Sequence, residues 1–176
     1  MRWQQIDTMT CSLARTLSVV GDRWTILILR DVFLGIRRFD AIQQDLQLTS
    51  QRLSDRLRKL VHDGVLRRVV YEDHPRRFEY RLTEKGFDLY PSIATMTERG
   101  DRWMAARAGV PVELVHQPCG HKINPKLVCP RCNLKIDARD MSARPGPALK
   151  GRGLPGQATR AQRLGAPDSP QEAVRP

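Results

Sequence analysis

The sequence predicts a mainly α-helical domain with a small β-hairpin, an α+β fold. The first observation is a helical stripe in which Leu53, Leu57 and Leu60 recur at one-turn spacing among long polar side chains. The second is a pair of strand-like runs after Gly64, separated by the turn dipeptide His74-Pro75. A polar, basic helix followed by a hairpin with a His-Pro-Arg-Arg tip predicts a winged helix-turn-helix.

The helices that precede this element are expected in the following order. Residues 1–10 form a short helical lead-in, and a second helix ends at Gly21. Asp22 then caps a strongly apolar helix over residues 24–34, which we expect at the centre of the domain because it is apolar nearly all round. A short helix over residues 38–47 completes the helix-turn-helix with the polar helix that follows.

After the hairpin, a helix is expected from Thr83 to about Met104, and Pro91 should kink or split it. This region carries more large apolar residues than one face of a small domain needs. The surplus, together with the apolar arm at residues 1–10, predicts a homodimer seam. A two-layer core within one monomer is the alternative.

Length and charge limit the classes of function. The 176 residues allow one domain with a core plus appendages, and the net charge of +11 favours a polyanionic partner. No apolar run approaches the ~20 residues that span a bilayer, and the N-terminus lacks the apolar middle of a signal peptide. We therefore expect a cytoplasmic protein without a membrane partner, whose cysteines are metal-bound or free rather than in disulfides.

Three segments are expected from composition. They are a DNA-binding and dimerisation domain at residues 1–110, a zinc-ribbon-like segment at 111–140, and a basic tail rich in proline and glycine at 141–176. The tail is expected to be disordered because it lacks aromatic residues and cannot offset the entropy of ordering.

The charge pattern of residues 48–81 favours double-stranded DNA as the partner. Nine Arg and Lys residues stand against five Asp and Glu residues there, on both the helix and the hairpin. An α-helix fits the major groove, and a basic hairpin beside it reaches the flanking backbone or minor groove. The alternative is an ordinary solvated helix face. We expect base contacts from Gln51, Arg52 and Arg56, phosphate contacts from Arg38, Lys59, Arg76 and Arg77, and further contacts from Thr49, Ser50 and His74.

Several short motifs occur in a fixed order over residues 11 to about 104. They are Cys11, Gly-Asp-Arg-Trp-Thr (21–25), Arg-Arg-Phe (37–39), Leu-Ser-Asp-Arg-Leu-Arg-Lys-Leu (53–60), Asp-Gly-Val-Leu (63–66) and Glu-Tyr-Arg-Leu-Thr-Glu-Lys-Gly (79–86). In their order and spacing they resemble HxlR-type winged-helix transcriptional regulators. The resemblance implies a homodimer joined through its N-terminal and C-terminal helices, with each recognition helix in a major groove of a palindromic site.

Cys11 has two interpretations. The resemblance implies that some family members sense electrophiles or oxidants through a matching cysteine, whereas others lack a known signal. A helix N-terminus favours a thiolate, and Arg15 one turn away acts in the same direction. The alternative is a small apolar residue buried beside Leu13. The effector itself stays unknown.

Residues 116–132 read His-Gln-Pro-Cys-Gly-His-Lys-Ile-Asn-Pro-Lys-Leu-Val-Cys-Pro-Arg-Cys. Two pairs of N or S ligands, each with two residues between its members, suit a closed tetrahedral Zn²⁺ site. The pairs are His116 with Cys119 and Cys129 with Cys132, and His121 is a rival fourth ligand. We expect a structural Zn²⁺ without an open position for catalysis. The alternatives are chance cysteines, or a module that now folds without metal.

The sequence favours one of three classes of function. No nucleophile-base pair, phosphate-binding loop or paired-carboxylate motif marks an enzyme, so we expect none. A DNA-binding transcriptional regulator is favoured. The alternatives are a zinc-ribbon module that binds a protein partner on a winged-helix scaffold, and a thiol-based redox regulator acting through Cys11.

Overall fold

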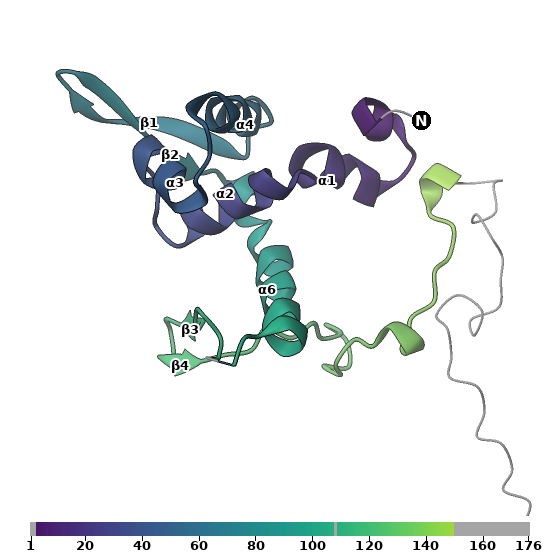
Figure 1. Cartoon of the computed structure of the whole chain (residues 1–176). Coiled ribbons are helices and arrows are strands. Elements are labelled where there is room, and N and C mark those ends of the chain that lie inside the picture. The colour runs from purple at the N-terminus through teal and green to yellow at the C-terminus, as the bar shows by residue number, and fades with distance from the viewer. Residues whose placement is uncertain (1–2, 108, 150–176) are drawn as a thin grey trace, which may run out of the picture. The chain divides into compact units, whose positions relative to one another are not determined.

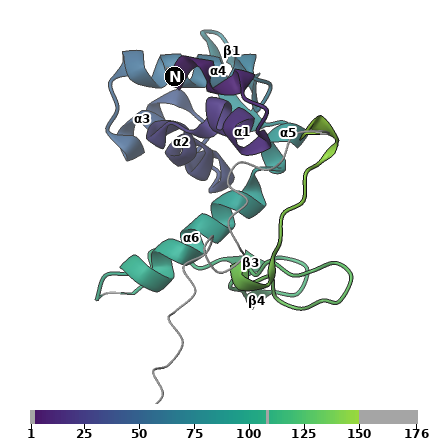
Figure 2. The same ribbon diagram turned by 90° about the vertical axis from the view of Figure 1, so that its right-hand side faces the viewer.

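The computed structural model describes residues 3–107 and 109–149. The helices and strands confirm the expected α+β class: a helical body carries a long antiparallel hairpin, and a second antiparallel pair of two-residue strands follows it in the chain (Figures 1 and 2). In chain order they are η1 (Trp3–Thr8), α1 (Ser12–Val20), α2 (Arg23–Phe33), α3 (Phe39–Leu46), α4 (Ser50–His62), β1 (Leu66–Asp73), β2 (Arg76–Leu82), α5 (Glu84–Phe87), α6 (Tyr90–Met104), β3 (Val115–His116), β4 (His121–Lys122), η2 (Ala138–Asp140) and η3 (Pro147–Leu149), where η denotes a 3₁₀-helix.

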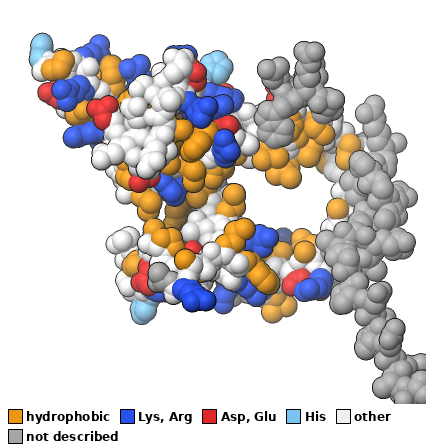
Figure 3. Space-filling model, viewed as in Figure 1, with side chains coloured by type: hydrophobic (Ala, Val, Ile, Leu, Met, Phe, Trp, Pro, Cys, Tyr) orange, Lys and Arg blue, Asp and Glu red, His pale blue; other side chains and the backbone are white. Residues whose placement is uncertain are grey.

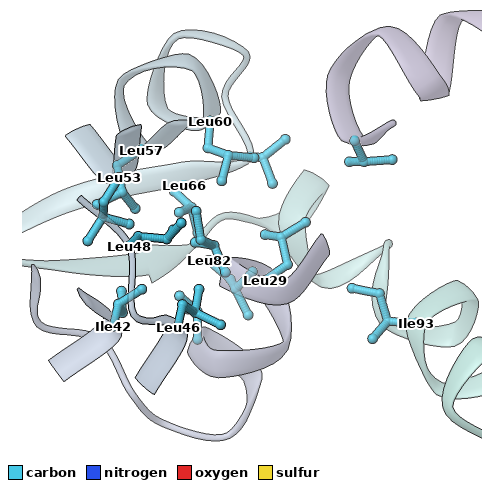
Figure 4. Packing of buried hydrophobic residues seen from close by; sticks show 14 residues of the cluster. Leu29, Ile42, Leu46, Leu48, Leu53, Leu57, Leu60, Leu66, Leu82 and Ile93 are labelled. Atoms are coloured by element: carbon cyan, nitrogen blue, oxygen red, sulfur yellow. The ribbon is translucent and has the colours of Figure 1, made fainter. Parts of the chain in front are cut away.

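The apolar stripe of α4 forms the centre of the core, as the spacing predicts. Leu53, Leu57 and Leu60 are fully buried and pack with Ile28 and Leu29 of α2. Figure 4 shows side chains from α3, α4, the hairpin and α6 converging on the same volume. The core therefore fixes which side of α4 faces solvent.

The turn between α3 and α4 is held by local hydrogen bonds. Gln47 ends α3 in the left-handed conformation, with φ of 51°. The Gln43 side-chain amide donates to the Leu48 carbonyl at 3.1 Å and to Ser50 Oγ at 2.9 Å. Thr49 Oγ1 accepts from the Arg52 amide at 3.4 Å and so caps α4. These bonds fix the geometry of the helix-turn-helix.

An arginine links α2 to α3 beside the core. Arg30 Nη2 lies 2.5 Å from an oxygen of Asp31 and 2.5 Å from an oxygen of Asp45. Asp31 is fully buried, and its Oδ2 has no hydrogen-bond partner. Burial raises the pKa of this carboxyl, while the neighbouring Arg30 acts in the opposite direction.

Strands β1 and β2 form the wing, defined as residues 66–82. Leu66 pairs with Leu82 at its base, and the register shifts between Val70 and Glu72. The tip is the His74-Pro75 turn, whose peptide bond is cis. The wing therefore extends away from the helical body from a buried base (Figure 1).

A clamp of three residues, Gly64, Val65 and Thr83, joins the two ends of the wing. The Thr83 amide donates to the Val65 carbonyl at 3.1 Å, and its hydroxyl donates to the Gly64 carbonyl at 2.6 Å. Thr83 Oγ1 also accepts from the Gly86 amide at 3.2 Å, which starts α5. Lys85 Nζ adds a bond of 2.7 Å to the Asp63 carbonyl at the end of α4.

Pro91 divides the C-terminal helical region, as expected. The short α5 ends at Phe87, and Pro91 lies in the first turn of α6, where a missing amide hydrogen is tolerated. Only the start of α6 packs on the body, through the buried side chains of Ile93 and Ala94. The remainder of α6 projects from it in both views (Figures 1 and 2).

By its contacts the chain divides into two units, residues 1–125 and 126–176. This boundary differs from the predicted one at residues 110 and 111, because residues 111–125 group with the winged-helix part. The predicted disorder of the tail lies outside the described residues from 150 onward. None of the described helices is both long and apolar enough to cross a membrane.

Gly86 provides a test of the packing at the base of the wing. A Cβ at this position would lie 2.9 Å from Leu82 Cδ2 and closer still to the Val65 carbonyl oxygen. We expect Gly86→Ala to lower the free energy of unfolding by about 1–3 kcal/mol, measured by urea denaturation. Gly100→Ala is the matched control, because nothing lies within 4 Å of its added Cβ. Equal stability of the two variants would contradict this packing.

Candidate nucleic-acid interface

The outward face of α4 is polar and continuous. Gln51, Asp55 and Arg58 lie on one exposed stripe, and Arg52 lies beside its start. Asp55 organises the stripe: its carboxylate accepts from Gln51 Nε2 at 3.3 Å and from Arg58 Nη1 at 3.3 Å. The stripe can therefore present both donors and acceptors to base edges.

Two predicted DNA contacts lie on the flank of α4 instead. Arg56 Nη2 pairs at 3.3 Å with Asp22, the residue that caps α2, and its Nε is buried without a hydrogen-bond partner. Lys59 Nζ pairs with Asp63 at 2.6 Å. The placement of Arg56 speaks against the predicted base contact, because its guanidinium is directed towards the start of α2.

Arg58 was missed by the sequence analysis. Its side chain is highly exposed, with 74% of it accessible. Its signal in the sequence was the seven-residue spacing from Gln51, which places both on one helix face. The sequence predicts the polar face of this helix as a whole, but Arg58 was not included among the residues of that face.

The small polar residues at the start of α4 form hydrogen bonds within the helix-turn-helix. Thr49 caps the helix, and the Ser50 hydroxyl accepts from Gln43. Both residues are exposed, so each retains a side for a phosphate oxygen at the helix N-terminus.

The arginines of the wing are held by aromatic rings and carboxylates. Arg76 and Arg68 both lie over the ring of Phe78, at 5.4 and 3.9 Å from its centroid. Arg77 lies 3.5 Å from Glu72, and a hydrogen bond with Tyr71 together with this carboxylate raises the pKa of Arg77. Figure 3 shows Lys and Arg side chains gathered on the projecting wing, with a histidine at its end.

Arg38 connects the wing to the helix-turn-helix. Its guanidinium lies 4.3 Å from the centroid of the Tyr71 ring. Its backbone forms a single antiparallel bridge with Glu79, and the neighbouring Arg37 carbonyl accepts from the Tyr80 amide at 2.8 Å. Residues 37–38 thus add a short edge to the wing and place two arginines between α3 and β2.

Cys11 lies at the N-cap position of α1, and its side chain makes no capping bond. The thiol is exposed, so the alternative of a buried apolar residue is wrong. Arg15, expected to act on it, instead donates to Ser12 Oγ at 3.2 Å.

The predicted metal ligands form two local turns. His116 Nδ1 lies 3.2 Å from Cys119 Sγ in the first turn. In the second, backbone amides of Cys132 and Arg131 direct hydrogen bonds to Cys129 and lower the pKa of its thiol. The two turns belong to different units. Among the described residues, no group of three or more His, Cys, Asp or Glu side chains stands at metal-binding spacing.

Known proteins match most of this chain. Residues 19–108 match the model of the HxlR-like helix-turn-helix family. An uncharacterised HTH-type transcriptional regulator of Mycobacterium tuberculosis, Rv3095, is 43% identical over 80% of this chain and 89% of its own length.

Two solved structures are also similar. The candidate transcription factor PA1607 is 34% identical, with a TM-score of 0.71 over 78% of this chain and 96% of its own. The redox regulator HypR in its oxidised form is 31% identical, with a TM-score of 0.50 over 55% of this chain and 100% of its own.

The helix-turn-helix, the wing and the basic exposed face of α4 agree with these similarities. Family and relatives are transcriptional regulators, which are not enzymes, as the sequence predicts. The chain belongs to the HxlR-like helix-turn-helix family and is a transcriptional regulator with a helix-turn-helix DNA-binding domain.

Proposed function

We propose that the protein is a homodimeric, sequence-specific DNA-binding regulator in which α4 enters the major groove. The observation that supports this proposal is an exposed polar stripe on α4 with an arginine-bearing wing beside it. The stripe offers Gln51, Arg52 and Arg58 to base edges. The wing offers arginines at its tip, where flanking phosphates lie when a recognition helix occupies the groove.

The existing partners of these arginines are compatible with binding. Arg58 is 74% exposed and pairs with an exposed Asp55, a surface ion pair of the kind that contributes roughly 0–1 kcal/mol. Exchange of such a partner for a phosphate or a guanine therefore costs little. Arg56 has a more structural role, because its pairing with Asp22 joins the recognition helix to the start of α2.

Homodimerisation is supported by the exposed apolar surface of α6. Met96 and Trp103 are seven residues apart on one face, and their exposed fractions are 57% and 69%. Met104 is 83% exposed, and Leu13 of α1 is 66% exposed. Side chains of this size are costly to leave in water, so a second copy that covers them is favoured.

A dimer also suits the operator that we propose. Two copies related by a two-fold axis place two α4 helices in successive major grooves, about 34 Å apart. Once one copy has bound its half-site, the second copy is held close to the other half-site. The second binding step therefore takes place at a high effective concentration. Palindromic half-sites one helical turn apart follow from this geometry.

Arg52 and Arg76 should have separable effects on DNA binding. Arg52→Ala should relax the preference at one operator position by about 1–3 kcal/mol, because a bidentate contact to guanine is lost. Arg76→Ala should weaken all sequences alike and reduce the salt slope by about one unit. Binding selection from a random DNA library and salt titrations measure the two effects. Indistinguishable sequence profiles for the two variants would contradict this division.

Arg56→Ala is the internal control for that experiment. Because Arg56 is paired with Asp22, its loss should lower the thermal midpoint while leaving the sequence preference unchanged. A relaxed preference at one base position in this variant would instead restore Arg56 as a base-reading residue.

The dimer interface is tested at Trp103. Trp103→Glu should give a monomer with strongly reduced operator affinity, because burial of a charge opposes association. Trp103→Phe is the matched control and should stay dimeric. Sedimentation velocity at micromolar concentration measures the state, and a wild-type monomer under these conditions would refute the proposal.

A thiol-based response is a second candidate, favoured by the exposed position of Cys11 at the start of α1 and by the similarity to HypR. In this proposal, diamide joins the Cys11 thiol and a second thiol in a disulfide, takes up their two electrons and two protons as it is reduced to the hydrazine, and so alters operator affinity.

Diamide should therefore change operator binding of the wild-type protein and have no effect on Cys11→Ser. Ser18→Ala on the same helix is the control that retains all four cysteines, and its response should persist. Fluorescence anisotropy with labelled operator DNA, followed by reduction with dithiothreitol, measures the response. An unchanged response in Cys11→Ser would exclude this cysteine as the sensor.

A further inference from the structure

A cavity of about 630 Å³ opens between α2, α3 and the start of α6, within residues 1–125. Most of its wall is apolar or aromatic, and residues from the segment 111–114 also line it. Cavities of roughly 300–1,000 Å³ are the size that encloses small molecules in proteins. The residues to which we assign DNA contacts do not line this cavity, so DNA binding does not account for it.

The first two turns of α6 form one wall of the cavity. Four residues recur there at the spacing of a single helix face. They are Tyr90, Ile93, Ala94 and Thr97. At the start of this wall, the ring of Tyr90 lies 5.0 Å from the ring of Phe33 on α2. The exposed residues Met96 and Trp103 lie on a different side of α6, so the cavity wall and the proposed dimer surface are separate faces.

Asp31 of α2 is a buried polar group in the cavity wall. Arg30 donates to its Oδ1 from Nε at 2.9 Å and from Nη2 at 2.5 Å, whereas its Oδ2 has no partner among the described residues. Burial raises the pKa of this carboxyl although Arg30 lies beside it. A buried carboxylate oxygen without a donor is unfavourable, so a ligand that donates a hydrogen bond to it gains stability.

The charge of the cavity wall determines which sign of ligand it favours. Among the described residues, the charged side chains that line it are Arg30, Asp31 and Asp45. Arg30 Nη2 lies 2.5 Å from an oxygen of each carboxylate, so two carboxylates share one guanidinium. With both carboxylates ionised, this cluster carries one net negative charge. It therefore attracts a cation and repels an anion.

We propose that this cavity is a binding site for a small amphipathic amine, a molecule with an apolar body and one protonated amino group. The apolar body lies against Trp24 of α2 and Ile93 of α6, and the ammonium group donates to Asp31 Oδ2. The side chain of Arg30 is 40% exposed, so it can move towards Asp45 and open the way to Asp31.

A ligand in this cavity adds contacts between α6 and the helical body. Ile93 and Ala94 are the buried residues of α6, and both line the cavity. A molecule held between them and α2 therefore bears on the junction from which α6 projects. Because α6 carries the apolar surface assigned to the dimer, we expect the ligand to change operator affinity, a consequence that rests on the proposed function.

Binding is tested first without DNA, by chemical-shift titration of the isotope-labelled full-length protein. The probes have matched shapes: phenylpropylamine, phenylpropanol and phenylpropanoate. The amine should bind saturably and at least about tenfold more tightly than the alcohol, because it forms a charge-assisted hydrogen bond. The carboxylate should bind most weakly. The largest shifts should include the indole N–H of Trp24 and the amides of Ala94 and Thr97.

Variants separate the charge of the site from its volume. Asp31→Asn should bring the affinity ratio of amine to alcohol to about one. Thr97→Phe fills the cavity and should weaken binding of all three probes by about tenfold or more. Thr95→Phe on the same helix is the matched control and should bind like wild type, because Thr95 does not line the cavity. Thr97→Phe decides the question if Asp31→Asn does not fold.

Three results would overturn the proposal: no saturable binding of the amine to wild type, equal affinities for amine and alcohol, or undiminished binding to Thr97→Phe. Binding to Trp103→Glu but not to wild type would show that a second copy covers the cavity, and would also exclude the ligand. A failure to bind operator DNA leaves these measurements unchanged, so the ligand site and the proposed function are tested separately.

Discussion

Burial of the leucine stripe on α4 is the interaction on which the DNA-binding surface depends. Each of the three leucines contributes roughly 1.5–3 kcal/mol when removed from water. Because their side chains point towards α2, the rotation of α4 about its axis is fixed. The polar residues at the remaining positions then have determined directions: one stripe faces solvent, and one flank faces the start of α2.

Many charged side chains on this surface already have a partner within the chain. Asp55 accepts from both Gln51 and Arg58, and the wing arginines lie over rings or beside carboxylates. Such contacts restrict long side chains to a few conformations, which reduces the entropy lost on association. Since the pairs are exposed and individually weak, exchanging one of these partners for another charged group costs little.

The sequence predicted most of the fold because the relevant signals are local. The period of the leucines, the cap at Asp22 and the turn at His74-Pro75 each determine structure within a few residues. The flank position of Arg56 could not be predicted, since it depends on a carboxylate 34 residues earlier in the chain.

The clamp at the base of the wing has a consequence for how the family can diversify. Because Gly64, Val65 and Thr83 hold both ends of the hairpin, residues between them form a loop whose closure is already secured. The entropy of such a loop grows slowly, by about 0.6 kcal/mol for each doubling of its length. Insertions, deletions and new charges at the tip are thus insulated from the core, so the wing is the part of this domain whose length and charge can change during evolution without endangering the fold.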